Sequence, residues 1–265
     1  MSYIQLGYVD IALAASLLTV NAGLSIFYGL GTGRRLLIAA VRMVVQLTLV
    51  GLVLKALFTT VSPWLTLLVA IAMVAFAGRE AMARQDRTFV GFWGYGLGTT
   101  SMLVAAGIVT LFTLTTQLHA DPWYDPRYAI PILGMILGNT MTGVSLALDR
   151  LLAEADAGRS RIEARLALGH TFRQAMQEPL RGAMRAGLIP TVNAMAAAGL
   201  VSLPGMMTGQ ILAGVDPVEA VKYQLLIMFL IAGGTALGVF CAAMMALRRL
   251  TDPRQRLRLD RLRVE

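Results

Sequence analysis

The stretch DRLLAEADAGRSRIEARLALGHTFRQAMQEPLRGAMR, residues 149–185, is the only long polar run that lies between apolar ones. It carries seven arginines. Four apolar residues recur among them at roughly helical spacing: Ile162, Leu166, Phe172 and Met176. Gly169 interrupts this pattern, and Pro179 suits the first turn of a new helix. We expect two short amphipathic helices across one end of a membrane domain, where they receive a partner protein or rest on lipid headgroups.

The composition is that of a polytopic membrane protein. Of the 265 residues, 57% are hydrophobic and 14% are charged, and the mean hydropathy is +0.67. The one cysteine, Cys241, lies in an apolar segment, so the chain has no intramolecular disulfide. The N-terminal MSYIQLGYVD lacks the basic region of a cleaved signal, so we expect the first apolar segment to be retained.

A membrane-spanning helix needs about 20 mostly apolar residues. Seven segments qualify: Tyr8–Leu30, Leu36–Phe58, Pro63–Gly78, Phe92–Leu118, Tyr128–Leu148, Ala186–Ala213 and Tyr223–Leu247. The third is short, and we expect its helix to continue into Ala83. The sequence therefore predicts an all-α fold with about seven transmembrane helices, formed as one permease-like domain over residues 1–265.

The distribution of basic residues predicts the orientation. Lys55, Arg127 and Lys222 fall on one side of the membrane, and Arg42 lies within the second segment, which leaves 19 of the 23 Lys and Arg residues on the other side. The positive-inside rule then places the N-terminus outside, and places both the 149–185 loop and the basic tail of residues 248–265 in the cytosol. We expect that tail to form a surface helix. This arrangement explains the net charge of +8 without nucleic acid.

Polar residues within the apolar segments are candidates for a translocation path, because such groups are costly in lipid. Arg42 and Gln46 share a helix face, although Arg42 can instead snorkel or pair for structure. Asn139 lies mid-segment, beside the GxxxG step of Gly134 and Gly138, for which we favour helix packing.

The sixth segment holds Pro190 and Asn193, then Ser202, Pro204 and Gly205, then Gln210. Proline and glycine at this depth predict a broken helix, either a path-lining gate or a static kink. The predicted path residues are Arg42, Gln46, Asn139, Met141, Asn193, Ser202, Pro204 and Gln210.

Metal binding has only weak candidates. His119, Asp121 and Asp125 lie together in the outer loop QLHADPWYDPR (residues 117–127), although such groups are more often solvated. Met206 and Met207 carry soft thioethers, but methionine is more often a packing residue.

Several motifs are absent from the sequence. No G-x-x-x-x-G-K-[ST] occurs, so the chain binds no ATP through a P-loop. H-E-x-x-H and G-x-S-x-G are also absent, and we expect no enzymatic site. No aspartate or glutamate is well placed within a span for proton coupling.

Three runs carry a resemblance to a known family: PILGMILGNTMTGVSLALDRL (131–151), EARLALG (163–169) and GLIPTVNAMAAAGLVSLPGMMTGQILAG (187–214). Together they resemble the FetB-type family of ABC-transporter permeases, which includes bacterial iron-export permeases and plant aluminium-sensitivity proteins. The resemblance implies a multi-pass permease of the bacterial inner membrane that exports iron, or another metal or chelate.

The resemblance also implies partners. A separate P-loop ATPase would bind ATP and Mg²⁺, while this chain binds no cofactor, and two docking sites imply a homodimer. The spacing E-A-x-x-x-x-G at Glu163, Ala164 and Gly169 is similar to the coupling loop of ABC importers, with Arg165 in place of the second alanine. The implied coupling residues are Glu163, Ala164, Arg165, Gly169, Phe172 and Arg173, and charge reversal at Arg165 and Arg173 is expected to uncouple the ATPase. A stand-alone carrier or channel, and an ABC permease for an organic substrate such as a nucleotide sugar, are the alternatives.

Overall fold

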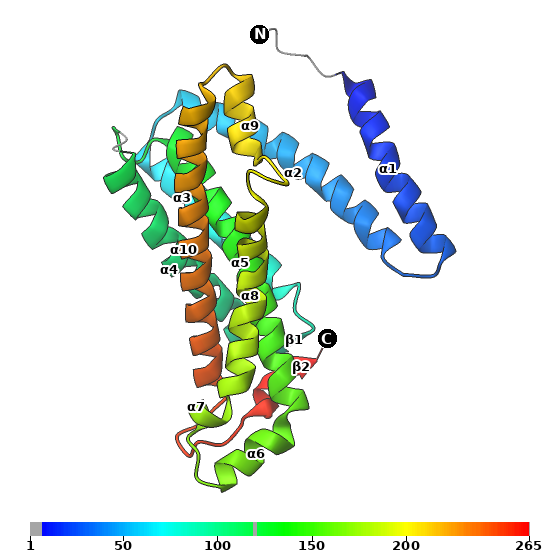
Figure 1. Cartoon of the computed structure of the whole chain (residues 1–265), viewed down its shortest axis with the longest axis vertical. Coiled ribbons are helices and arrows are strands. Elements are labelled where there is room, and N and C mark those ends of the chain that lie inside the picture. The colour runs from blue at the N-terminus through cyan, green and yellow to red at the C-terminus, as the bar shows by residue number, and fades with distance from the viewer. Residues whose placement is uncertain (1–6, 119–120, 265) are drawn as a thin grey trace. The chain divides into compact units, whose positions relative to one another are not determined.

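The computed structural model describes residues 7–118 and 121–264, which form two compact units (Figure 1). The first unit comprises the described residues up to Val61 together with Leu212–Gly214. It contains α1 (Tyr8–Phe27) and α2 (Gly33–Thr59), which pack against each other. Ser25 fixes their connection, because its hydroxyl oxygen accepts the Gly33 N–H at 2.8 Å.

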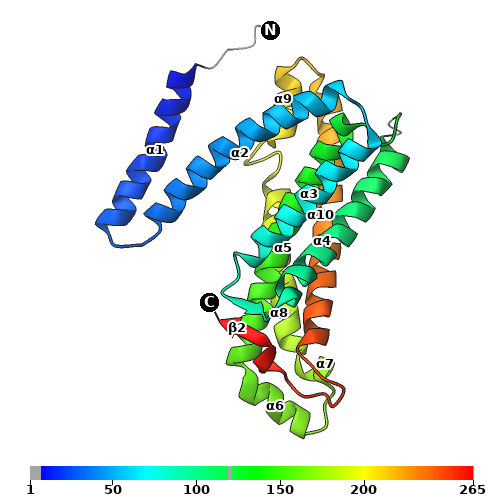
Figure 2. The ribbon, with the colours of Figure 1, turned by 180° about the vertical axis from the view of Figure 1, so that it is seen from behind.

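The second unit is a helical bundle with a small two-stranded sheet at one end (Figures 1 and 2). Its elements are, in order, α3 (Pro63–Met82), β1 (Arg87–Phe89), α4 (Phe92–Phe112), the π-helix η1 (Thr113–Gln117), α5 (Pro126–Ala157), α6 (Arg159–Ala167), α7 (Phe172–Ala175), α8 (Gln177–Ala197), α9 (Gly205–Leu212), α10 (Pro217–Arg249), the 3-10 helix η2 (Leu259–Arg261) and β2 (Leu262–Val264).

Within the described residues, six helices are long and apolar enough to span a membrane: α1, α2, α3, α4 with η1, α5 and α10. The prediction of an all-α polytopic membrane protein is confirmed. As predicted, α3 continues beyond Gly78, ending at Met82 with Ala83 as its C-cap. The orientation and the single-domain assignment stay predictions.

The predicted sixth segment does not form one helix. It is divided between α8, which ends at Ala197, and α9, which begins at Gly205. Pro190 lies inside α8, so the interruption comes at residues 198–204 rather than at that proline. There the Gly199 N–H donates to the Ser202 carbonyl at 2.9 Å, and a β-bridge joins Ala198 to Ser202. The expected broken helix is therefore present.

The core is built around α5, which packs against α3, α4, α8 and α10. The backbones of α5 and α8 approach each other closely at Gly143 and Gly187. A Cβ atom added to Gly187 would lie 2.7 Å from the Gly143 carbonyl oxygen, and one added to Gly143 would lie 2.8 Å from the Gly187 carbonyl oxygen. The predicted step at Gly134 and Gly138 does not make this crossing, since a Cβ at Gly138 would have no described atom within 4 Å.

Two expectations for the connecting segments were wrong. The stretch from residue 149 does not start as a separate loop, because α5 continues through it to Ala157. Beyond Arg249, the described part of the tail forms no α-helix: β2 pairs antiparallel with β1, and Leu257, Leu259 and Leu262 pack against the core. The Arg261 guanidinium also donates to the carbonyls of Arg249 (2.7 Å) and Thr251 (3.1 Å), which holds the tail on the end of α10.

Candidate functional site

Residues 159–176 form the α6–α7 element, a pair of short helices that ends at the C-cap Met176 and lies at the end of the bundle (Figure 1). Its inner side is fully packed: Ile162 and Met176 are 0% exposed, and Phe172 is 4% exposed. These residues belong to the set whose helical spacing predicted an apolar face. The element is therefore anchored on the core of the membrane bundle rather than tethered by its ends.

Polar contacts brace the same element. Arg161 and Arg165 both form ion pairs with Glu178 of α8, at 3.3 and 3.2 Å. At the start of α7, Thr171 caps the helix reciprocally with Gln174, and the Phe172 N–H donates to Gln255 Oε1 at 2.6 Å. Arg165 is therefore an internal brace, so reversing its charge would disturb the element itself as well as any partner contact.

The tip between the two helices is exposed. Leu168 is 79% exposed and precedes Gly169, whose φ of +89° suits a residue without a side chain. Glu163, Ala164 and Arg173 are also exposed, whereas Phe172 points inward. Leu168 was missed at the sequence level. The signal that indicates it is an apolar residue directly before the glycine that ends an amphipathic helix.

The tail beneath α7 is held by charged contacts. The backbone N–H and the side chain of Arg256 both donate to Asp252, which lowers the pKa of Asp252 from 3.8 to about 2. Arg258 donates to Asp260 at 2.8 and 2.7 Å and lowers the pKa of Asp260 to about 2. Asp252 holds the turn that presents Gln255 to α7, because it accepts the backbone N–H groups of Arg254 and Arg256 on either side of Gln255.

The predicted path residues in α5 and α8 differ in exposure. Asn139 and Asn193 are exposed, although both lie in apolar helical segments. The Asn139 side chain donates to the Met135 carbonyl at 2.8 Å, which leaves its oxygen available. Met141 lies only two residues from Asn139 and packs against the core instead.

The remaining predicted residues of the second unit lie at or after the helix break. Ser202 is exposed, and Pro204 is half-buried, with its carbonyl accepting the Thr208 N–H at 3.1 Å. In α9, Gln210 Oε1 is buried and has no hydrogen-bond partner among the described residues. Met206 packs against the core, and Met207 is half-buried.

Arg42 and Gln46 lie in the first unit. They share one face of α2 with Val41 and Val45, as their spacing predicted. Their role in a path stays a prediction.

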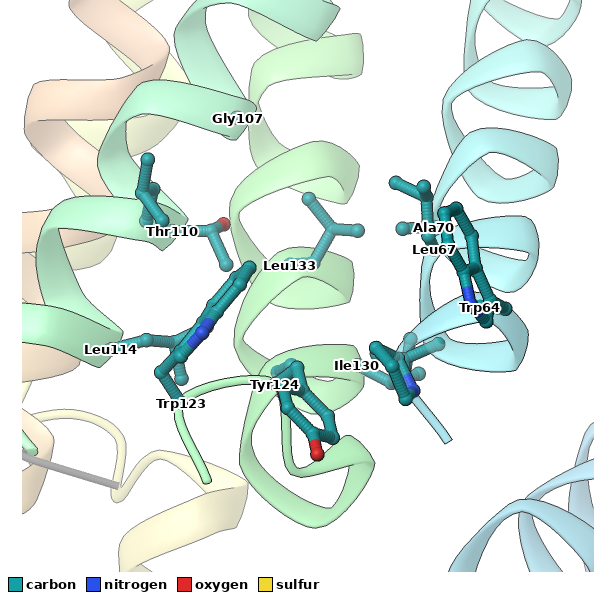
Figure 3. A pocket seen from close by; sticks show the side chains of 14 residues that line it. Trp64, Leu67, Ala70, Gly107, Thr110, Leu114, Trp123, Tyr124, Ile130 and Leu133 are labelled. Carbon is teal, nitrogen blue, oxygen red and sulfur yellow. The ribbon is translucent and has the colours of Figure 1, made fainter. Parts of the chain in front are cut away.

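The outer loop holds apolar packing as well as the suggested metal ligands. Trp123 and Tyr124 turn towards an apolar cavity of about 370 Å³ that Trp64, Thr110 and Leu133 also line (Figure 3). Asp125 caps α5 by accepting the Arg127 N–H at 2.9 Å. Among the described residues no group of three metal-binding side chains occurs, and His119 lies outside those residues, so a metal site with Asp121 and Asp125 stays a prediction.

The chain was compared with known proteins. The model of the uncharacterised protein family UPF0014 matches residues 8–251. A UPF0014 membrane protein of Synechocystis is 39% identical over 96% of this chain and 97% of its own length. The Escherichia coli protein named probable iron export permease protein FetB is 35% identical over 96% of each chain. The Arabidopsis thaliana protein ALUMINUM SENSITIVE 3 is 32% identical over 86% of this chain and 81% of its own length.

No solved structure matches the chain. The family match and the long apolar helices make it a multi-pass membrane protein, and the bacterial relatives point to the inner membrane. This chain belongs to the UPF0014 family of membrane proteins.

Proposed function

We propose that this chain is the membrane-spanning permease subunit of an ABC transporter, and that it exports iron, or another metal or its chelate. ATP would be hydrolysed, with Mg²⁺, by a separate P-loop subunit. The direction and the cargo are suggested by the relative named a probable iron export permease.

The observation that carries the proposal is the contrast within the α6–α7 element. Its base is buried against the bundle at Ile162 and Met176, while its tip at Leu168 is 79% exposed. The exposed leucine would enter a groove on the partner protein, in the way that the apolar residues of an amphipathic helix dock into a hydrophobic groove. A rigid base allows a movement of that partner to reach α8 directly, because Arg161 and Arg165 connect α6 to Glu178.

The path is proposed to lie along the exposed polar side of α5 and α8. Asn139 and Asn193 are exposed there, and Gly138 beside Asn139 has open space around it. Polar groups in apolar helices are expected to face protein or a wet cavity rather than lipid. A second copy of the chain would supply that environment, which supports a homodimer. Neutral carboxamides would suit a hydrated or chelated ion better than a bare one.

The direct test uses the permease reconstituted with its P-loop partner. Leu168→Glu places a charge at the tip and is expected to weaken the complex at least tenfold and to abolish stimulation of the ATPase. Ser160→Glu is the matched control, because Ser160 is exposed at the start of α6 and the substitution adds the same charge. If Leu168→Glu bound and stimulated the ATPase like the unchanged protein, the docking role would be wrong.

The cargo requires a separate measurement. ATPase activity is compared without metal, with ferrous iron and over a panel of other metals. Stimulation by iron supports iron as the cargo. A complex that hydrolyses ATP without any metal response would favour the second candidate, an ABC permease for an organic substrate, and transport in proteoliposomes driven by a gradient alone would indicate a stand-alone carrier.

A further inference from the structure

A cavity of about 360 Å³ opens between α4, α7 and α10, away from the proposed path. α7 lies beside the C-terminal end of α10 in both views (Figures 1 and 2). Arg173 of α7 and Arg248 of α10 border this cavity together. Its other walls are largely apolar and include Val104, Phe240 and Met244. We call it the two-arginine pocket.

Neither arginine of the two-arginine pocket is paired with a carboxylate among the described residues. The side chains of Arg173 and Arg248 form no ion pair or hydrogen bond in the part of the chain that the structure describes. Their neighbours differ: Arg249 stacks over the ring of Trp93 at 4.7 Å, and Arg165 pairs with Glu178. Two guanidinium groups on one cavity repel each other and favour an anion between them. A phosphate group matches the fork of donors that arginine presents.

The apolar walls of the pocket indicate a ligand that has an apolar part as well as a phosphate. Phe240 is 51% exposed and Val104 is 40% exposed, and both belong to helices that are long and apolar enough to span the membrane. A small inorganic anion would leave these side chains uncovered, and so would a single carboxylate. A phospholipid presents a phosphate and an acyl chain together, and both would be satisfied here.

We propose that the two-arginine pocket binds an anionic phospholipid, with the phosphate between Arg173 and Arg248 and an acyl chain against Val104, Phe240 and Met244. Basic pockets between transmembrane helices are a known means of holding lipid headgroups. Binding would attach α7 to α10 through the lipid. Arg173 is also one of the coupling residues that the family resemblance implies, but the test uses the permease alone, so its outcome does not depend on an ATPase partner.

The chain carries its own reporter for this site. Cys241, its only cysteine, lines the same pocket and is partly exposed. The rate of alkylation of Cys241 by a maleimide is measured on the full chain in a mild detergent. The additions compared are phosphatidylglycerol, phosphatidylcholine and soluble glycerol 3-phosphate. Phosphatidylglycerol is expected to slow alkylation at least fivefold in a saturable manner, while the other two leave the rate nearly unchanged.

Equal protection by phosphatidylcholine would overturn the proposal, because it would show an acyl-chain groove without selection for charge. Equal protection by glycerol 3-phosphate would also overturn it, in favour of a soluble anion site. Both comparisons use the unsubstituted protein, so a folding defect of a variant cannot account for the result.

Variants then locate the site. Arg173→Gln with Arg248→Gln is expected to remove the protection by phosphatidylglycerol. Arg181→Gln with Arg185→Gln is the matched control, because both arginines are exposed on α8 and the change in net charge is the same. Native mass spectrometry of retained phosphatidylglycerol provides a second readout. The lipid would bind elsewhere if the Arg173→Gln, Arg248→Gln protein retained phosphatidylglycerol, and showed protection of Cys241, to the same extent as the control protein.

Discussion

The pair of helices α5 and α8 is closed at one end and open at the other. Towards the α6–α7 element, Gly143 and Gly187 bring the two backbones together, and Arg161 and Arg165 extend the contact to Glu178. Towards α9, Asn139 and Asn193 are exposed and α8 stops at Ala197. The same two helices thus differ along their length: their backbones are in close contact towards the α6–α7 element, and they carry exposed carboxamides towards α9, as a rigid docking end and a cargo path would require.

The largest effect is expected from filling the closed end. Gly187→Leu forces a side chain into the Gly143 carbonyl, and overpacking of this kind costs about 1–3 kcal/mol. For a chain of this size, that corresponds to a fall of roughly 2–12 °C in Tm. The measurement is a thermal melt of the purified protein in detergent.

The control for that change lies on α5, the other helix of the pair. Gly138→Leu adds the same side chain where no described atom lies within 4 Å of a Cβ, so it is expected to leave the Tm of the single chain unchanged. An equal fall in Tm for Gly138→Leu and Gly187→Leu would show that the two ends of the α5–α8 pair do not differ in packing.

The next effect concerns the open end. Asn139→Leu with Asn193→Leu is expected to leave the Tm within a few degrees, because both side chains are exposed, yet to reduce transport in proteoliposomes at least tenfold. Leu146→Asn, an exposed change on α5 outside the predicted path, is the control. Normal transport by the double variant would remove these residues from the path.

A smaller effect tests how the closed end is held. Gln255→Ala removes the acceptor for the Phe172 N–H, a bond that contributes about 0.5–1.5 kcal/mol. Hydrogen exchange of the Phe172 amide is expected to accelerate up to about tenfold. Gln177→Ala, at an exposed glutamine in the first turn of α8, should leave that exchange unchanged. A Gln255→Ala protein with unaltered exchange would contradict the role of the tail.

The smallest effect is expected on acidification. Because the pKa of Asp252 is lowered from 3.8 to about 2 in the folded tail, its contribution to stability is present above pH 4 and is lost as the pH falls towards 2. The protection of the 252–261 backbone amides, which is the exchange rate corrected for the intrinsic effect of pH, should therefore fall over that interval. In Asp252→Asn the same segment should exchange faster already at pH 5, and a fully parallel pH profile in the two proteins would count against this contact.

The sequence was sufficient for the features that depend on periodicity and composition. Apolar runs predicted the long helices, and the spacing of Ile162 and Phe172 predicted the inner face of the α6–α7 element. Proline and glycine near Ser202 predicted an interruption. In each case the signal is local, because hydrophobic spacing and backbone restriction act within a few turns of a helix.

Features that depend on distant residues could not be predicted. The close approach of Gly143 to Gly187 was not indicated by either residue alone, while the more conspicuous Gly134 and Gly138 do not make the crossing. The tail was expected to be a surface helix, because its arginines gave no hint of the strand that pairs with Arg87–Phe89. The joint position of Arg173 and Arg248 likewise arises only from tertiary packing.

The β1–β2 ladder has a consequence for the order of events on the ribosome. β1 lies between α3 and α4, but its partner, Leu262–Val264, is translated only after α10. The strand β1 in the α3–α4 connection therefore remains unpaired while α4 to α10 are synthesised and inserted. Closure of this end would therefore follow the synthesis of α10, and a chain cut short before residue 262 would reach the membrane with that edge unpaired.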